Sequence, residues 1–523
     1  MRNALSLLFF SAVTIPMLNG CGNRSMAIGT CSGGACLAII TPVSISMTDS
    51  PPSGVSVLFY QIKLSAAALN PVSGTPVSLL PVDSGPNGSS MPIPIDLTQL
   101  QAVSQFLSTV NVAPGVYSSL SLTFSNPLLV IYNASDSAIA SSCAIGSVCQ
   151  IAPTMNNSAT VNLNAPAFPV SATAYNPLSF LVDFHLDNML QPDFSLNLGT
   201  ANGVTIAQIP ASTTATAQEF GTITGSVFNS NSGSNQFTIE TPDIRLYTID
   251  SSNGAAYNNF PASACSTGST ACFAYGQSIR VQVDSLGTFG NLYTSQVAYI
   301  QAPNEQTVEG TIINMVPSPT NIAGAPPLQL SLLIHGNPSN SSSLPPGAVA
   351  TVTFATYPSF SVDTNGFQLP AGITFANGSD LIVGQNVQMK IVAGSLSVLS
   401  GQPPSSNWST PQSVSFAADS IELEPSQLTA TVSALNPSAQ SFTLSGSSGV
   451  TFFSWPSASP NAASFNILTT AQTTYQGASP DTMGGFALND LVSVSGWLFP
   501  PATYASLPTL VAASALKRPL GVF

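Results

Sequence analysis

The sequence predicts an all-β protein, in which a β-sandwich-like N-terminal domain is followed by three small β-barrel-like repeats in series. Three observations lead to this fold class. Apolar and polar residues alternate along many short segments, as expected for strands with one buried face. The 42 prolines and 38 glycines are spread along the chain and interrupt these segments at strand length. After residue 210, similar segments recur three times in the same order, which is the pattern of a repeat architecture.

The pattern divides the chain into six parts. The expected parts are a lipoprotein signal peptide (1–20), a lipidated cysteine with a flexible tether (21–40), the β-sandwich-like domain (41–205), β repeat 1 (206–303), β repeat 2 (304–425) and β repeat 3 (426–523).

The first residues have the features of a bacterial lipoprotein signal. Arg2 supplies a positive charge, and residues 5–18 form an apolar run too short to span a bilayer comfortably. The run leads into "LNGC" at residues 18–21, which resembles the lipobox, although Asn19 stands where that pattern prefers a small residue. We expect cleavage before Cys21 and attachment of a lipid to this cysteine. The alternative is an ordinary secretory signal followed by an unrelated cysteine.

A lipid on Cys21 predicts a location in the bacterial cell envelope, with a membrane as the partner of the anchor. Gly22 follows the cysteine, whereas an aspartate at this position commonly retains such proteins at the inner membrane. The resemblance therefore favours the outer membrane or cell surface over the inner membrane.

Charged residues are scarce, and most of them are acidic. The chain has 8 Lys and Arg against 21 Asp and Glu, which gives a formal net charge of −13. So few cations cannot neutralise a row of phosphates, and nucleic acid is excluded as a class of partner. Because 44% of the residues are apolar, the chain has enough surface to bury and is not expected to be disordered.

Apart from Cys21, the cysteines form three couples that are close in sequence. Such couples favour disulfides in an oxidising compartment, each closing a short polar loop. No two C-x-x-C pairs occur together, so we expect neither a zinc site nor any other cofactor. The expected disulfides join Cys31 to Cys36, Cys143 to Cys149, and Cys265 to Cys272.

The N-terminal domain has a clear strand pattern in residues 116–124, "VYSSLSLTF", where Leu120, Leu122 and Phe124 share one face. Four ordered segments of this domain resemble domain of unknown function family 4382, which occurs in secreted and lipid-anchored bacterial proteins. The resemblance implies an all-β, sandwich-like domain and brings no established activity. The segments are "MTDSP" at 47–51, "IDLTQL" at 95–100, "APGVYSSLSLTF" at 113–124 and "FLVDF" at 180–184.

Each repeat begins with a similar strand and later has a turn that leads into an alternating strand. The turns begin at Gly276, Gly384 and Asn489. This order of segments resembles domain of unknown function family 5666. Asn489 and the following Asp490 replace the Gly-Gln of the other two turns, but asparagine tolerates a left-handed backbone, so we expect the turn to be retained. The first strands are "QEFGTITGSV" from 218, "QTVEGTIINM" from 306 and "QLTATVSALN" from 427.

The sequence contains no recognisable catalytic motif, and we expect no enzyme activity. The two histidines, His185 and His335, are too far apart for an H-E-x-x-H metalloprotease motif. On a strand, Asp183, His185 and Asp187 would share one face and could hold a divalent ion. The simpler interpretation is a polar outer face on a strand whose other side is core.

Three functions remain open at this point. A non-catalytic cell-surface binding, adhesion or scaffold module is favoured, with a polysaccharide or a surface protein as its partner. A carbohydrate-binding module is the first alternative; it requires an exposed aromatic ring, for which Trp408 in the loop "PPSSNWSTP" is the candidate. An envelope hydrolase acting on polysaccharide is the second; it requires converging carboxylates such as Asp183 and Asp187.

Overall fold

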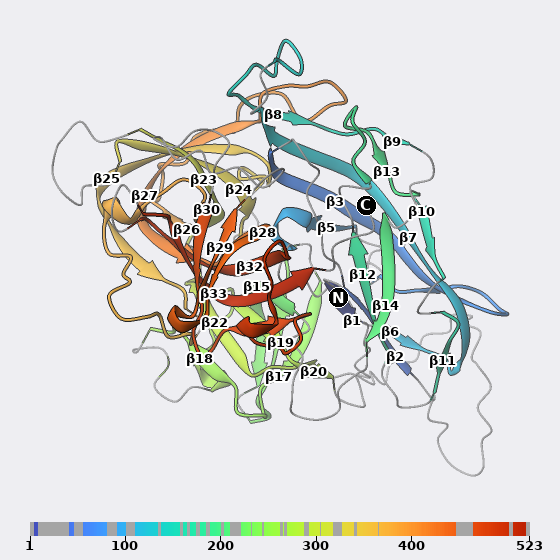
Figure 1. Cartoon of the computed structure of the whole chain (residues 1–523). Helices are drawn as coiled ribbons and strands as arrows, with labels where there is room; N and C mark the ends of the chain where they lie inside the picture. The colour runs from blue at the N-terminus through green and yellow to red at the C-terminus, as the bar shows by residue number, and fades with distance from the viewer. Residues whose placement is uncertain are drawn as a thin grey trace.

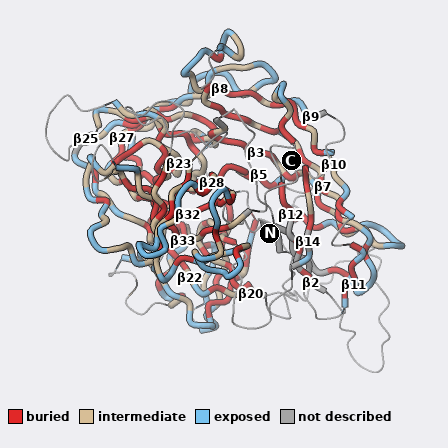
Figure 2. Tube along the Cα trace, viewed as in Figure 1, coloured by how far each residue is buried: buried red, intermediate tan, exposed pale blue. Residues whose placement is uncertain are grey.

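The computed structural model confirms the all-β class (Figure 1). The described segments are β-strands joined by turns and by 3-10 helices of three or four residues. Figure 2 shows that the residues buried in the structure lie along the strands, while the exposed residues concentrate in the connections. The structure describes residues 5–8, 41–46, 56–80, 92–100, 110–133, 137–156, 160–164, 168–173, 178–184, 189–199, 203–209, 221–231, 233–242, 245–261, 265, 269–286, 292–303, 305–316, 327–338, 342–364, 366–445, 464–501 and 506–518.

The N-terminal domain contains a seven-stranded sheet built around two long antiparallel strands, β3 (Ser56–Pro71) and β7 (Gly115–Tyr132). The predicted alternation along β7 is confirmed, because Leu120, Leu122 and Phe124 are all buried. The other strands of this sheet are β4 (Val77–Ser78), β5 (Ile93–Asp96), β8 (Val148–Ile151), β10 (Thr160–Leu163) and β11 (Val170–Ala172).

A second, five-stranded sheet shares its hydrophobic core with the first. Phe124 of β7 meets Phe184 of the second sheet edge to face, with ring centroids 5.4 Å apart. The core of this domain therefore lies between two sheets. The second sheet contains β1 (Leu5–Leu8), β2 (Thr41–Ser46), β6 (Val110–Val112), β12 (Leu178–Phe184) and β14 (Val204–Ile209), and a separate parallel pair is formed by β9 (Met155–Asn156) and β13 (Leu196–Asn197).

Strand β1 belongs to the segment predicted as a signal peptide. In the uncleaved chain, β1 is antiparallel to both β12 and β2. Strands β2 and β12 also meet each other through one parallel pair, Val43 with Leu178. Cleavage before Cys21 would remove β1 from this sheet. Cys21 itself lies outside the described residues.

The rest of the chain forms three units of strands, which lie to the left of and below the N-terminal domain in Figure 1. We define unit 1 as β15–β22, unit 2 as β23–β27 and unit 3 as β28–β33. Unit 1 contains β15 (Gly221–Asn231), β16 (Gln236–Glu240), β17 (Leu246–Asp250), β18 (Ala256–Asn258), β19 (Ser278–Val283), β20 (Ser285–Leu286), β21 (Leu292–Tyr293) and β22 (Gln296–Gln301). Unit 2 contains β23 (Thr307–Val316), β24 (Gln329–Gly336), β25 (Val349–Val362), β26 (Asn386–Ile391) and β27 (Ser413–Glu424), and unit 3 contains β28 (Ser426–Asn436), β29 (Ser441–Ser445), β30 (Ser464–Leu468), β31 (Thr474–Gln476), β32 (Leu491–Phe499) and β33 (Thr509–Arg518).

Strand pairing closes a five-stranded ring in unit 2 and another in unit 3. In unit 2 the order is β23-β24-β25-β27-β26, and β26 pairs again with β23. Unit 3 repeats this order as β28-β29-β30-β33-β32. In both rings the third and last strands are parallel and every other pairing is antiparallel. In unit 1, the third strand β17 is parallel to β21, which lies just before the last strand β22.

The turn that leads into β19 of unit 1, β26 of unit 2 and β32 of unit 3 is the same in all three units. Gly276, Gly384 and Asn489 have left-handed backbones with φ of 78°, 94° and 68°. The N–H of each residue donates to a carbonyl of the first strand at 2.8 Å. The prediction that Asn489 retains the turn is confirmed. The next residue in each unit, Gln277, Gln385 or Asp490, accepts a hydrogen bond on its side chain from the N–H three residues earlier, at 2.7, 2.8 and 2.6 Å.

The first strand of each unit also has a β-bulge in its pairing with the second strand, after the residue bonded to this turn. A bulge re-aims the extra side chain away from the regular alternation. The bulged residues are Phe228 in unit 1, Ile313 in unit 2 and Ser433 in unit 3.

Two of the three predicted disulfides are confirmed, Cys143–Cys149 and Cys265–Cys272. Each joins residues six or seven positions apart and closes a loop between elements of one domain or unit. The third couple, Cys31 and Cys36, lies outside the described residues.

The turn of unit 3 gives a testable prediction. Because Asn489 is left-handed, Asn489→Ala should lower the free energy of unfolding by about 1 kcal/mol, whereas Asn489→Gly should not destabilise the protein. The midpoint of urea unfolding of the two variants and the wild type measures this difference. Equal losses in both variants would mean that the asparagine side chain, and not its backbone, is what the turn requires.

Candidate functional site

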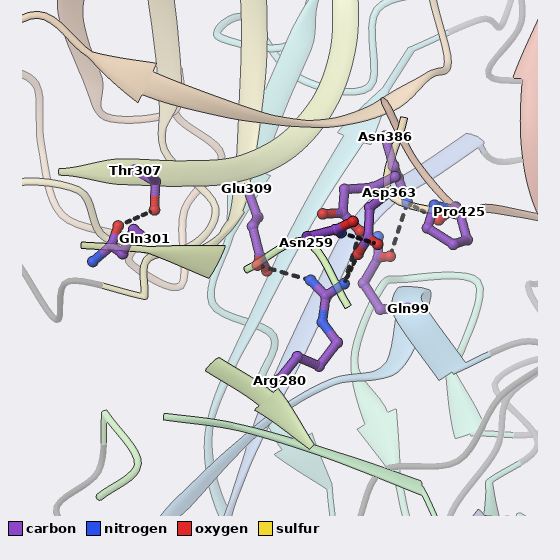
Figure 3. Close-up of polar contacts among 10 residues, drawn as sticks. Gln99, Asn259, Arg280, Gln301, Thr307, Glu309, Asp363, Asn386 and Pro425 are labelled. Carbon is purple, nitrogen blue, oxygen red and sulfur yellow. Dashed lines mark hydrogen bonds and ion pairs between the residues drawn. The ribbon is translucent and has the colours of Figure 1, made fainter. Parts of the chain in front are cut away.

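The candidate site is a group of buried polar residues where unit 1, unit 2 and the N-terminal domain meet (Figure 3). It has two neighbouring parts. The acidic cluster consists of Arg280, Glu309, Asp363, Glu422 and Glu424. The histidine network consists of Asp96, Gln99, Thr311, His335 and Asn386.

Arg280 enters the acidic cluster from unit 1. On β19 its neighbours Ile279 and Val281 are buried in the core of unit 1, so Arg280 lies on the opposite face of the strand and reaches unit 2. Its guanidinium contacts Glu309 at 3.1 Å and Glu424 at 2.9 Å. The N–H groups of a guanidinium point in several directions, so one guanidinium can bind carboxylates on more than one side.

Asp363 is the third carboxylate on this guanidinium, at 3.0 Å. Asn259 of unit 1 also donates to Asp363, at 2.8 Å. From unit 3, the indole N–H of Trp497 donates to the backbone carbonyl of Asp363 at 2.9 Å. Three units therefore meet at this one residue of unit 2.

The acidic cluster has more carboxylates than cations, and burial shifts their protonation. Burial raises the pKa of Glu424 to about 8 and that of Glu422 to about 7, and the neighbouring carboxylates add to both shifts. Burial opposes the charge of Arg280, but Glu424, Glu309 and Asp363 outweigh it and raise the pKa of the guanidinium further. The cluster thus retains protons near neutral pH.

His335 joins unit 2 to the N-terminal domain. Its Nδ1 lies 2.6 Å from the Oδ2 of Asp96 at the end of β5, and its Nε2 lies 2.8 Å from the hydroxyl of Thr311. The order of carboxylate, imidazole and hydroxyl is that of a nucleophile triad, in which the hydroxyl donates to the imidazole.

The hydrogen bonds of Asn386 argue against activation of Thr311. The Nδ2 of Asn386 donates to the backbone carbonyl of Pro425 at 3.2 Å, so its Oδ1 faces Thr311 and accepts the hydroxyl proton. A hydroxyl has one proton to donate, so the Nε2 of His335 must donate to Thr311 rather than accept from it. The imidazole of His335 thus joins Asp96 of the N-terminal domain to Thr311 of unit 2.

Apolar contacts accompany the hydrogen bond between His335 and Asp96. Leu58, Phe59 and Val130 of the N-terminal domain form a small core with Leu333 of unit 2, against which the bulged Ile313 packs. The outer face of the seven-stranded sheet is therefore covered by unit 2 at this place.

The structure places the sequence candidates differently from their expected roles. Asp183, expected on a polar outer face, is only 5% exposed and lies between buried Val182 and Phe184. His185 and Asp187 lie outside the described residues. Among the residues that the structure describes, no group of three or more His, Cys, Asp or Glu side chains could hold a metal ion.

Trp408 is half-buried against the N-terminal domain. Its ring meets Phe194 edge to face with centroids 4.9 Å apart, and its carbonyl accepts a hydrogen bond from Ser142 at 2.6 Å. Next to it, Ser409 and Gln150 exchange backbone hydrogen bonds at 2.8 and 3.0 Å. This loop of unit 2 is an interdomain contact and does not present a free aromatic platform.

Sequence reasoning missed Arg280, Glu424 and the pairing role of His335. A weak signal existed for Arg280, because it is a rare cation in the middle of the alternating strand "SIRVQV". Nothing in the sequence indicated that its partners would come from residues 309, 363 and 424 of another unit.

No protein-family model matches the chain, and no curated protein matches it significantly. The resemblances to families 4382 and 5666 therefore rest on the quoted segments. Within the described part of the chain, no helix has the length and apolar character needed to cross a membrane.

The raised carboxyl pKa values predict a pH dependence of stability. The folded chain keeps protons on Glu422 and Glu424 in a pH range where the unfolded chain, with a reference value of 4.5, has released them. Raising the pH from about 5 to about 8 should therefore lower the free energy of unfolding by several kcal/mol, since each unit of pKa difference corresponds to about 1.4 kcal/mol. Urea unfolding at a series of pH values measures this slope.

Two variants test whether Glu424 causes this pH dependence of the free energy of unfolding. Glu424→Gln stays uncharged at every pH, so its stability should vary less between pH 5 and 8. Glu305→Gln alters an outlying pair, with Lys390 at 2.6 Å, and should leave the slope unchanged. A slope that persists in full in the Glu424→Gln variant would contradict the assignment.

Proposed function

We propose that the protein is a lipid-anchored, extracytoplasmic and non-catalytic binding, adhesion or scaffold module of the bacterial cell surface. The observation that carries this proposal is the acidic cluster. Its carboxyl groups and guanidinium, which in an enzyme would face a substrate, are directed at one another across the junction of the units. Together with the His335–Asp96 pair, they hold the units in a fixed arrangement suited to presenting a surface.

We interpret the N-terminal domain as a β-sandwich and the three units as small β-barrels. The shared core between two sheets supports the first interpretation. The ring order supports the second, because five-stranded Greek-key barrels, of which the OB-fold is one example, leave few exposed strand edges. Few exposed strand edges suit a protein outside the cell, because exposed edges can pair with other chains and cause aggregation. We also propose that the N-terminal domain belongs to family 4382 and the three units to family 5666.

The envelope hydrolase is less well supported than the module. One of its proposed carboxylates, Asp183, is buried. In the Asp96–His335–Thr311 arrangement, the hydroxyl of Thr311 donates its proton to Asn386 and not to the imidazole. A carbohydrate-binding module remains compatible with the arrangement of units.

The anchor is tested by Cys21→Ala in a lipoprotein-competent bacterium. The wild type should gain the mass of its acyl chains and sediment with membranes, and the variant should lose both properties, because two or more chains bind a membrane firmly. Intact mass spectrometry and membrane fractionation measure these outcomes. Cys31→Ala is the matched control, since it removes a nearby cysteine that is expected in a disulfide and should keep the lipid. A wild-type chain without acyl mass would overturn the anchor.

A further inference from the structure

Unit 1 carries two aromatic rings side by side on its surface. The rings of Phe228 and Tyr275 have centroids 6.3 Å apart and planes inclined by 54°. Phe228 is 43% exposed and Tyr275 is 75% exposed. We call these two residues the aromatic pair. The two rings together form a small exposed apolar patch on unit 1.

The backbone holds both rings in place. Phe228 is the bulged residue of β15, and Tyr275 precedes the left-handed Gly276. The N–H of Gly276 donates to Val227 at 2.8 Å, which ties the two ring-bearing segments together. Two residues before Tyr275 in the sequence, Phe273 packs against the core of unit 1. A platform fixed in this way loses little conformational entropy when it binds a ligand.

The other two units provide an internal comparison. The positions equivalent to the aromatic pair carry Ile313 and Val383 in unit 2, and Ser433 and Leu488 in unit 3. Ile313 packs against the N-terminal domain, so the same corner of the ring already serves as a contact surface in unit 2. Among these three corners, that of unit 1 alone has two rings.

The charge of unit 1 restricts the ligand. Between residues 206 and 303 the only basic residues are Arg245 and Arg280. Arg245 is buried and lies over the ring of Tyr247, with 5.3 Å between the guanidinium carbon and the centroid, and Arg280 belongs to the acidic cluster. An anionic ligand would find no free cation there, which argues against an anionic ligand.

The size and surroundings of the aromatic pair restrict the ligand further. Two rings fall far short of the roughly 800 Å² per partner that a stable protein interface buries. Asn229 and Asn231, which follow Phe228 along β15, are exposed, and their amide groups can donate hydrogen bonds to hydroxyl groups. The face of an aromatic ring is negative and attracts the C–H groups on the flat side of a sugar ring.

We propose that the aromatic pair of unit 1 binds a neutral oligosaccharide, whose sugar rings stack on Tyr275 and Phe228. This inference deepens the proposed function, since it gives the surface module a ligand class. It transfers the aromatic role expected of Trp408 to a different unit, where the rings are exposed.

The test uses the purified full chain on an array of neutral gluco-, manno-, galacto- and xylo-oligosaccharides, with uronate oligosaccharides for contrast. Calorimetry with the best neutral binder then compares variants. Tyr275→Ala and Phe228→Ala should each weaken binding about tenfold, the effect of one aromatic contact. Tyr357→Ala removes another tyrosine of similar exposure, 64%, and should bind as the wild type does.

Three outcomes would overturn the inference: no neutral oligosaccharide binds, the uronates bind better, or the aromatic variants bind like the wild type. Self-association that is lost in Tyr275→Ala, without saccharide binding, would assign the pair to a second copy of the chain. Since binding is measured without a membrane, a chain that is acylated on Cys21 but binds no saccharide overturns this inference and leaves the anchor standing.

Discussion

The burial of one guanidinium among carboxylates of another unit determines how the units fit together. A buried cation is tolerated only when its partners are fixed around it, and removing a partner leaves an uncompensated charge. Arg280 therefore holds unit 1 in register with Glu309 and Glu424. Because Asp363 is also bonded to Asn259 and to Trp497, this constraint extends to unit 3. The units keep their relative positions as a result.

The junction with the N-terminal domain follows a different physical logic. There the outer face of a sheet is covered by an apolar contact around Phe59 and Leu333, next to the hydrogen bond between His335 and Asp96. Hydrophobic contact has no preferred direction, whereas the hydrogen bonds of His335 and Asn386 specify one orientation. Together they explain why a chain with so few charges uses several of them in its interior.

Local patterns in the sequence were sufficient for the strands, the confirmed disulfides and the turn at Asn489, because each depends on residues close in sequence. The alternation of Leu120, Leu122 and Phe124 is one example. Contacts between distant segments were not accessible to the same reasoning. Asp183 was expected to face outward, because the alternation of polar and apolar residues describes a single strand. It does not show which other segments cover that strand. Trp408 looked exposed because its partner, Phe194, lies in another domain.

The core of unit 2 is completed by residues of unit 3, since Trp497, Phe499 and Val511 belong to the same hydrophobic cluster as the strands of unit 2. These residues follow unit 2 in the sequence and are synthesised after it. When the last strand of unit 2 has been made, the side chains that fill one side of its core are therefore still missing. Unit 2 completes its core only once unit 3 has been synthesised, so the three repeats, although alike in strand order, do not fold one after another as independent domains.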